Sequence, residues 1–104
     1  IFSANSHIEV YNDLDNSGTH TWKKIGVPYR ILEDYFTIFT YTSSFCELIL
    51  EPGVEIEIPK SFTIGSYLGN GRLIAQGTAS DPIVFKPITY YNSSSPTHWY
   101  GITF

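Results

Sequence analysis

Residues 48–58 read LILEPGVEIEI and residues 73–85 read LIAQGTASDPIVF. Each segment is a short apolar run, a corner marked by Gly or Pro, and a second apolar run. The residues that open them, Leu48 and Leu73, are 25 positions apart, which is the scale of one coil of a β-solenoid. Residues 99–104, WYGITF, repeat part of the pattern. We therefore predict short strands that stack, each pairing in parallel with its counterpart one coil away.

A local hairpin or meander is the alternative for this stretch. Asn70-Gly71 is a dipeptide typical of tight hairpin turns. Most of the apolar runs are only three to five residues long, however, and they are joined by corners instead of such turns. Short strands at a coil-length interval favour stacked rungs over hairpin arms.

The rest of the chain also has strand character. Residues 7–11 are the best strand candidate near the N-terminus, and residues 12–21 form a polar loop that contains a glycine. Pro28 biases the residue before it towards an extended conformation and begins another strand. Residues 35–42 are rich in the aromatic and β-branched side chains that strands favour.

No helix is expected. The only candidate, residues 31–35, is too short and has no persuasive N-cap. We expect an all-β chain in which residues 1–20 form an irregular N-terminal strand and polar loop, and residues 21–104 form solenoid coils.

Length and composition indicate one ordered domain. The chain has 104 residues, 42% of them hydrophobic and 15% charged, which is typical of a globular protein with a modest core. Its net charge is −4, and its largest basic cluster is the pair Lys23-Lys24. Because nucleic-acid binding needs several cations on one face, we expect no nucleic-acid partner. No apolar run approaches the roughly 20 residues of a membrane span.

The ends of the sequence suggest a piece of a longer protein. The chain begins at Ile1, contains no Met, and stops at Phe104 within a segment of strand character. No signal peptide is visible, but a missing targeting signal says little about a fragment.

Four segments resemble the opening coils of right-handed parallel β-helix proteins, the pectate-lyase-like group of bacterial secreted and cell-surface proteins. These segments are residues 48–56, 71–78, 81–85 and 99–104, and residues 21–29 are similar to the segment that often precedes such coils. The resemblance covers residues 21–104. It implies a single-stranded, right-handed solenoid truncated at its C-terminus, and a secreted or cell-surface location in a bacterium.

The same resemblance implies roles for two glycines and for the coil ends. Gly53 and Gly77 stand where the backbone turns sharply between rungs, which favours a positive φ or a close approach. If the last rung has an open edge, its N–H and C=O groups invite pairing with another copy. We therefore expect self-association through the open solenoid end.

Glu55 and Glu57 are the most suggestive pair of carboxylates. Two residues apart on a strand, they project from one face about 7 Å apart, near the separation of the acid and base in an inverting glycosidase. Val54, Ile56 and Ile58 take the inward positions, however, so glutamates between them are what a solvated face would show. The solvated face is the favoured interpretation.

Catalytic members of the pectate-lyase-like group carry calcium-binding carboxylates and a basic residue, or clustered aspartates, on successive coils. The aspartates of this chain are few, and none has a counterpart one coil on: Asp13, Asp15, Asp34 and Asp81. Near the regular coils the basic residues are Lys60, Arg72 and Lys86. We assign no catalytic residue and no cofactor.

No metal site is expected either. Residues 13–18 begin like a calcium loop, but the twelfth position falls on Lys24, so a polar turn is favoured. His7, His20 and His98 lack the spacing of metal ligands. Cys46 lies in an apolar neighbourhood, which indicates a buried, inert thiol.

Aromatic residues gather around the one long excursion, residues 87–97. They are Tyr90, Tyr91, His98, Trp99 and Tyr100. Flat rings beside Asn and Ser could stack on sugars and hydrogen-bond their hydroxyl groups, and loops often carry function. In the competing interpretation, Trp99 and Tyr91 only cover the flank of a coil.

We therefore expect a non-catalytic structural or adhesive fragment of an exported bacterial protein that contacts carbohydrate through these aromatics. The alternative is the N-terminal cap of a polysaccharide lyase or glycoside hydrolase whose catalytic coils follow Phe104. Successive coils with stacked Asp, Lys or Arg after that residue would favour the enzyme.

Overall fold

The chain is all-β, as predicted. The computed structural model describes residues 6–11, 14, 17–32, 35–40, 45–58, 61–65, 70–87 and 102–103, and these residues contain no helix. The strands are β1 (Ile8–Val10), β2 (Gly18–Trp22), β3 (Tyr29–Ile31), β4 (Tyr35–Ile38), β5 (Cys46–Leu50), β6 (Glu55–Ile58), β7 (Ser61–Ile64), β8 (Gly71–Ala75), β9 (Val84–Pro87) and β10 (Ile102–Thr103).

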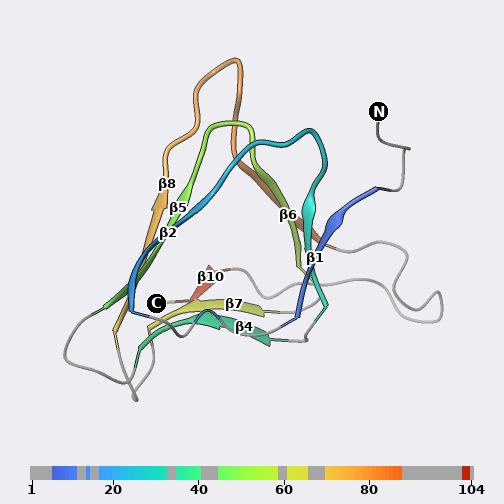
Figure 1. Cartoon of the computed structure of the whole chain (residues 1–104). Coiled ribbons are helices and arrows are strands. Elements are labelled where there is room, and N and C mark those ends of the chain that lie inside the picture. Colours follow the sequence, from blue (N-terminus) through green and yellow to red (C-terminus); the bar gives the residue numbers. More distant parts are fainter. Residues whose placement is uncertain are drawn as a thin grey trace.

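The strands form three parallel sheets, which Figure 1 shows as the sides of a triangle. We name each sheet by one of its inner strands. The β6 sheet has the order β1-β3-β6-β9, the β7 sheet β4-β7-β10, and the β5 sheet β2-β5-β8. Leu48 pairs with Leu73 in a parallel register, which confirms the stacking predicted from their spacing. The hairpin alternative at Asn70-Gly71 is wrong, because β7 and β8 on either side belong to different sheets.

The chain passes through the three sheets in the same order in each circuit. One circuit contains β2, β3 and β4, the next β5, β6 and β7, and the third β8, β9 and β10. The order extends towards the N-terminus, because β1 pairs with β3 and Leu14 forms a parallel bridge to Ile38. His20 and Thr21, between which we expected a domain boundary, both lie in β2. This arrangement is compatible with a β-solenoid.

The inward positions of the three sheets build the core. Val54, Ile56 and Ile58 are at most 1% exposed, which confirms that the alternation of residues 54–58 directs them inwards. On β5, Leu48 stands between His20 of one neighbouring strand and Leu73 of the other. Each inward residue packs on its counterpart in the next coil. Full burial of one such aliphatic side chain contributes about 1.5–3 kcal/mol to the free energy of unfolding.

A run of aromatic rings crosses the interior from coil to coil. The ring centroids of Trp22 and Phe36 are 5.8 Å apart, those of Phe36 and Phe62 5.2 Å, and those of Phe62 and Phe85 5.6 Å. Tyr29 stacks on Trp22 at 4.8 Å. Such contacts add to the apolar burial because edge-to-face and offset arrangements suit the ring quadrupoles.

Both glycines expected at sharp turns have those roles. Gly53, between β5 and β6, has a φ of 86°, which side chains with a Cβ rarely adopt. At Gly77 a Cβ would lie 2.8 Å from the backbone nitrogen of Ile83. The first glycine allows the turn itself, and the second allows the loop before β9 to close.

Candidate functional site

The aromatic site expected from the sequence lies outside the described residues. This applies to all of its members: Tyr90, Tyr91, His98, Trp99 and Tyr100. They occur in the sequence between β9 and β10, and their role stays a prediction. Asp13 and Asp15 of the calcium-like segment also lie outside the described residues.

The main polar feature that the structure describes is a column of alternating charge on the outer face of the β6 sheet. Glu9, Arg30, Glu57 and Lys86 occupy successive register positions on β1, β3, β6 and β9. Parallel neighbours in register are about 4.8 Å apart, so each charge lies beside the opposite charge of the next strand. We call this set the charge column.

At the centre of the charge column is a shielded ion pair. The Nε and Nη2 atoms of Arg30 lie 3.1 and 3.0 Å from Oε1 of Glu57. The two side chains are only 14% and 11% exposed. The expectation that Glu57 belongs to a solvated face is therefore wrong. Its partner is 27 residues away in sequence, so only the stacking of β3 on β6 reveals the contact.

The other glutamate of the suggested pair has a different partner. Oε2 of Glu55 accepts a hydrogen bond from Nζ of Lys86 at 3.1 Å, and both side chains are 43% exposed. Glu55 and Glu57 are thus each engaged by a cation from an adjacent strand. These contacts join strands of successive coils.

A second polar column lies on the outer face of the β5 sheet. Glu47 accepts hydrogen bonds from Oγ1 of Thr19 and from Nη1 of Arg72, each at 3.0 Å, and it is 7% exposed. The guanidinium carbon of Arg72 lies 4.5 Å from the ring centroid of Phe45, within the range of a cation–π contact. Glu47 therefore links three successive coils through one carboxylate.

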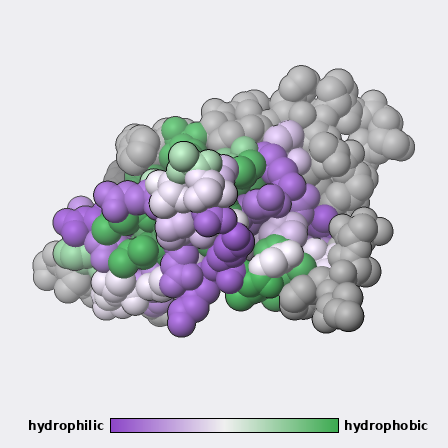
Figure 2. Space-filling view, turned by 90° about the horizontal axis from the view of Figure 1, so that it is seen from above, coloured by the Kyte–Doolittle hydropathy of each residue, from purple (hydrophilic) through white to green (hydrophobic). Residues whose placement is uncertain are grey.

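The corners between the β5 and β6 sheets are joined by a long side chain. Lys24 follows β2, passes over Gly53 in the next coil, and places its Nζ 2.6 Å from Oδ1 of Asp81 in the coil after that. Figure 2 views the molecule from the side of these corners, where hydrophilic residues are interspersed with smaller hydrophobic patches. The Lys24–Asp81 pair is exposed, so solvent screens it.

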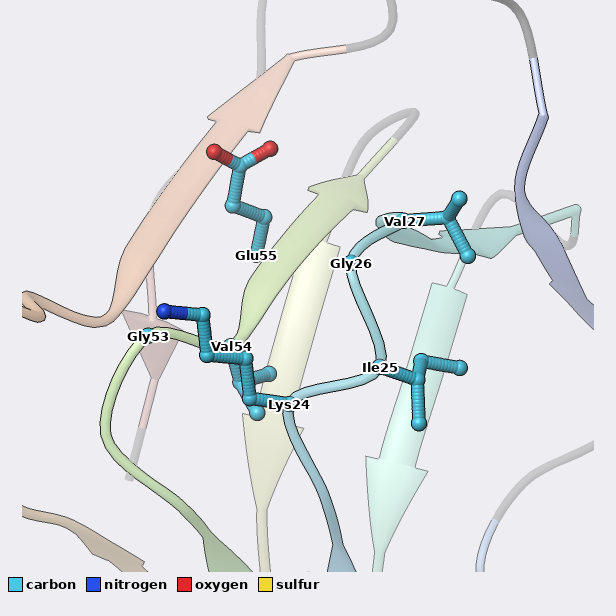
Figure 3. A pocket seen from close by; sticks show the side chains of 7 residues that line it. All are labelled: Lys24, Ile25, Gly26, Val27, Gly53, Val54 and Glu55. Carbon is cyan, nitrogen blue, oxygen red and sulfur yellow. The ribbon is translucent and has the colours of Figure 1, made fainter. Parts of the chain in front are cut away.

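A small pocket opens beside Lys24 (Figure 3). Its volume is about 160 Å³, and its lining is Lys24, Ile25, Gly26, Val27, Gly53, Val54 and Glu55. Lys24 and Glu55 supply its charge, and each already has an ionic partner, in Asp81 and Lys86. Both charged side chains of the pocket are therefore engaged in ion pairs between coils.

Titratable groups near the first coil make local contacts. Nε2 of His7 lies 3.3 Å from Oε2 of Glu9 and 3.4 Å from Nη1 of Arg30. The hydroxyl of Tyr11 donates to Glu9, and that hydrogen bond, with the nearby negative charge, raises the pKa of Tyr11. Burial raises the pKa of Tyr29, whose hydroxyl donates to the carbonyl of Lys23 at 2.7 Å. Both phenols are neutral at physiological pH.

Cys46 is buried, and its Sγ–H donates to the carbonyl oxygen of Leu14 at 3.4 Å, which confirms the expected buried thiol. Within the described part of the chain, no cluster of three or more His, Cys, Asp or Glu residues could hold a metal ion. Among the same residues no helix is long and apolar enough to cross a membrane.

The chain matches no protein-family model, no curated protein and no solved structure.

Proposed function

We propose that this chain forms the opening coils of a right-handed parallel β-helix of the pectate-lyase-like group, and that its role is structural or adhesive. In this proposal the coil stack belongs to an exported bacterial protein and holds an aromatic segment for contact with carbohydrate. The observation that carries the proposal is the cyclic order of strands, in which three circuits each supply one parallel strand to each sheet. The right-handed sense is the one that parallel crossover connections favour.

The polar contacts between coils support a scaffold role. Glu47 is held from both neighbouring coils, Arg30 reaches Glu57 in the next coil, and Lys24 reaches across two coils to Asp81. Each contact fixes one strand or corner against another. A rigid stack of this kind can present a segment inserted between two of its strands.

The position of the aromatic residues supports a carbohydrate contact. In the β7 sheet, Phe36 pairs with Phe62, 26 residues on, whereas Phe62 pairs with Ile102, 40 residues on. The longer circuit contains residues 88–101, which include all five candidate aromatics. An insertion of this size in an otherwise regular coil is where a binding segment is expected.

Glycan-array screening of the 104-residue chain, followed by calorimetry on any glycan found, tests the carbohydrate contact. We expect binding that Trp99→Ala abolishes and that Tyr11→Ala retains, because Tyr11 is an exposed aromatic directly after β1, outside the inserted segment. Circular-dichroism melting curves check that both variants fold. Binding to no glycan, or binding that survives substitution of each of the five aromatics, would contradict the proposed contact.

The enzyme-cap alternative depends on coils that follow residue 104. Among the described strands, β8, β9 and β10 each pair on one side only, so a further coil could stack on them. The sequence of a longer natural chain distinguishes the two functions. Asp, Lys or Arg residues stacked at a coil-length interval would favour the enzyme.

A further inference from the structure

We propose that copies of this chain stack head to tail, with β9 of one copy pairing in parallel with β1 of the next so that Lys86 lies opposite Glu9. The proposal rests on the coil architecture of the proposed function and does not depend on carbohydrate binding. It specifies the two edges, their register and the residues that select them.

β1 and β9 are the outer strands of the β6 sheet, and among the described residues each pairs on one side only, with β3 and with β6. An outer strand directs alternate N–H and C=O groups away from its sheet, and these groups can pair with a strand of another chain. Because all pairs in this sheet are parallel, addition of β1 to β9 would continue its pattern.

The charge column begins with Glu9 on β1 and ends with Lys86 on β9, with Arg30 and Glu57 between them in alternation. The two edges therefore carry opposite charges at the same register position. The side chain of Glu9 is 46% exposed and that of Lys86 is 43% exposed, so both can meet a partner. Stacking would extend the alternation across the junction without placing like charges side by side.

The inward, apolar positions of the two strands fit the same register. If Lys86 lies opposite Glu9, then Phe85 lies opposite Ile8, one position earlier on each strand. Both belong to the inward set, because Ile8 pairs with Tyr29, Tyr29 with Ile56, and Ile56 with Phe85. Ile8 is 41% exposed and Phe85 is only half-buried, whereas Ile56 in the middle is fully buried. A slip of one residue would place Glu9 over Phe85 and is therefore disfavoured.

The partly buried apolar residues around the core occur at both ends of the stack. Val10, Leu14, Trp22 and Tyr29 lie in the first circuits, and Leu73, Ile83, Phe85 and Ile102 in the last. Both ends thus present apolar surface that a second copy could cover. Because the two joined edges differ, the contact is heterologous and can repeat, so the expected product is an open series of oligomers.

Charge exchange at the two edges tests the proposal on the full 104-residue chain. Sedimentation velocity over a wide range of concentration should show wild-type oligomers that grow with concentration. Glu9→Lys alone and Lys86→Glu alone each bring like charges together at the junction, and each should raise the association Kd about tenfold. An equal mixture of the two variants should associate like the wild type, because each edge then meets the opposite charge on the other variant.

A control and a double variant separate edge effects from loss of folding. Glu51→Lys makes the same charge change as Glu9→Lys at the corner between β5 and β6, away from both edges, and should leave the Kd unchanged. The double variant Glu9→Lys/Lys86→Glu should again associate by itself. Rescue in the mixture also shows that the single variants fold.

Two results would overturn the proposal. If the wild-type chain stays monomeric at every concentration, its copies do not stack. The β9 edge would then pair with something other than a second copy, such as a further coil. Oligomers whose Kd is insensitive to both single substitutions, or that the mixture does not restore, would exclude this register. A folded monomer that still binds glycan would leave the proposed function intact and reject the stacking alone.

Discussion

Gly71 shows how closely the coils approach one another at a single residue. It begins β8, and a Cβ built on it would overlap the carbonyl oxygen of Ile38 and lie 2.7 Å from the backbone nitrogen of Gly65. That nitrogen donates to the same carbonyl at 2.7 Å. The obstacle is therefore backbone in a hydrogen bond between two coils, which cannot move aside as a flexible side chain can.

We predict that Gly71→Ala lowers the free energy of unfolding by about 3 kcal/mol, the upper range for insertion of a methyl group where there is no space. Urea denaturation followed by circular dichroism measures the change. Gly18→Ala is the matched control. Gly18 has a φ of 102° but open space around its Cβ position, so its cost should be only about 1–2 kcal/mol. Equal losses for the two variants would show that close approach at Gly71 is not the cause.

At the scale of strands and corners, the contacts between coils differ in their exposure to solvent. The Arg30–Glu57 pair joins the centres of β3 and β6, and the side chain of Arg30 is 14% exposed. The Lys24–Asp81 pair joins two corners, and the side chain of Lys24 is 51% exposed. A shielded carboxylate that loses its cation is left poorly solvated, whereas an exposed one is hydrated.

Removing one cation from each pair should therefore have unequal effects. We expect Arg30→Ala to destabilise the protein by about 3 kcal/mol, because Glu57 stays shielded without its partner. Lys24→Ala should cost less than about 1 kcal/mol. Urea titration at low and at high salt measures both. A loss for Lys24→Ala that equals or exceeds the loss for Arg30→Ala would contradict this ranking.

At the scale of the whole molecule, stability should be highest in the middle of the stack. β5, β6 and β7 each pair with a strand on both sides, whereas β1, β2, β8 and β9 are the outer strands of their sheets. The fully buried side chains Leu48, Ile56 and Phe62 also belong to the middle coil. Local opening therefore removes fewer contacts at the ends than at the centre.

Amide hydrogen exchange should reveal this gradient. We expect the amides of β5 and β6 to exchange slowest, at the rate of global unfolding, and those of β1 and β9 to exchange faster. Mass spectrometry or NMR at low protein concentration would measure the monomer. The buried thiol of Cys46 should react with a labelling reagent only as fast as the β5 amides exchange. Uniform protection along the chain would instead indicate a single cooperative opening unit.

Much of the fold could be predicted from local patterns in the sequence. The 25-residue spacing of Leu48 and Leu73 predicted their parallel pairing, and the alternation of residues 54–58 predicted which side chains point inwards. Both predictions depend on repeats along the sequence. Side chains on one face of a strand recur every two residues, and paired strands recur once per circuit. The aromatic site rests on composition alone, with no repeating geometry behind it, and it stays a prediction.

The sequence by itself determined that this protein is all-β, that its short strands pair in parallel one circuit apart, and that Val54, Ile56 and Ile58 enter the core. The tertiary structure alone decided which polar side chains meet. Glu57 meets Arg30, Glu47 meets both Thr19 and Arg72, and Lys24 reaches Asp81. These partners are 25 to 57 residues apart, and the circuits differ in length, so no fixed spacing predicts them. The register of each strand against the next, set by packing of the inward side chains, brings these charges together on the outer face.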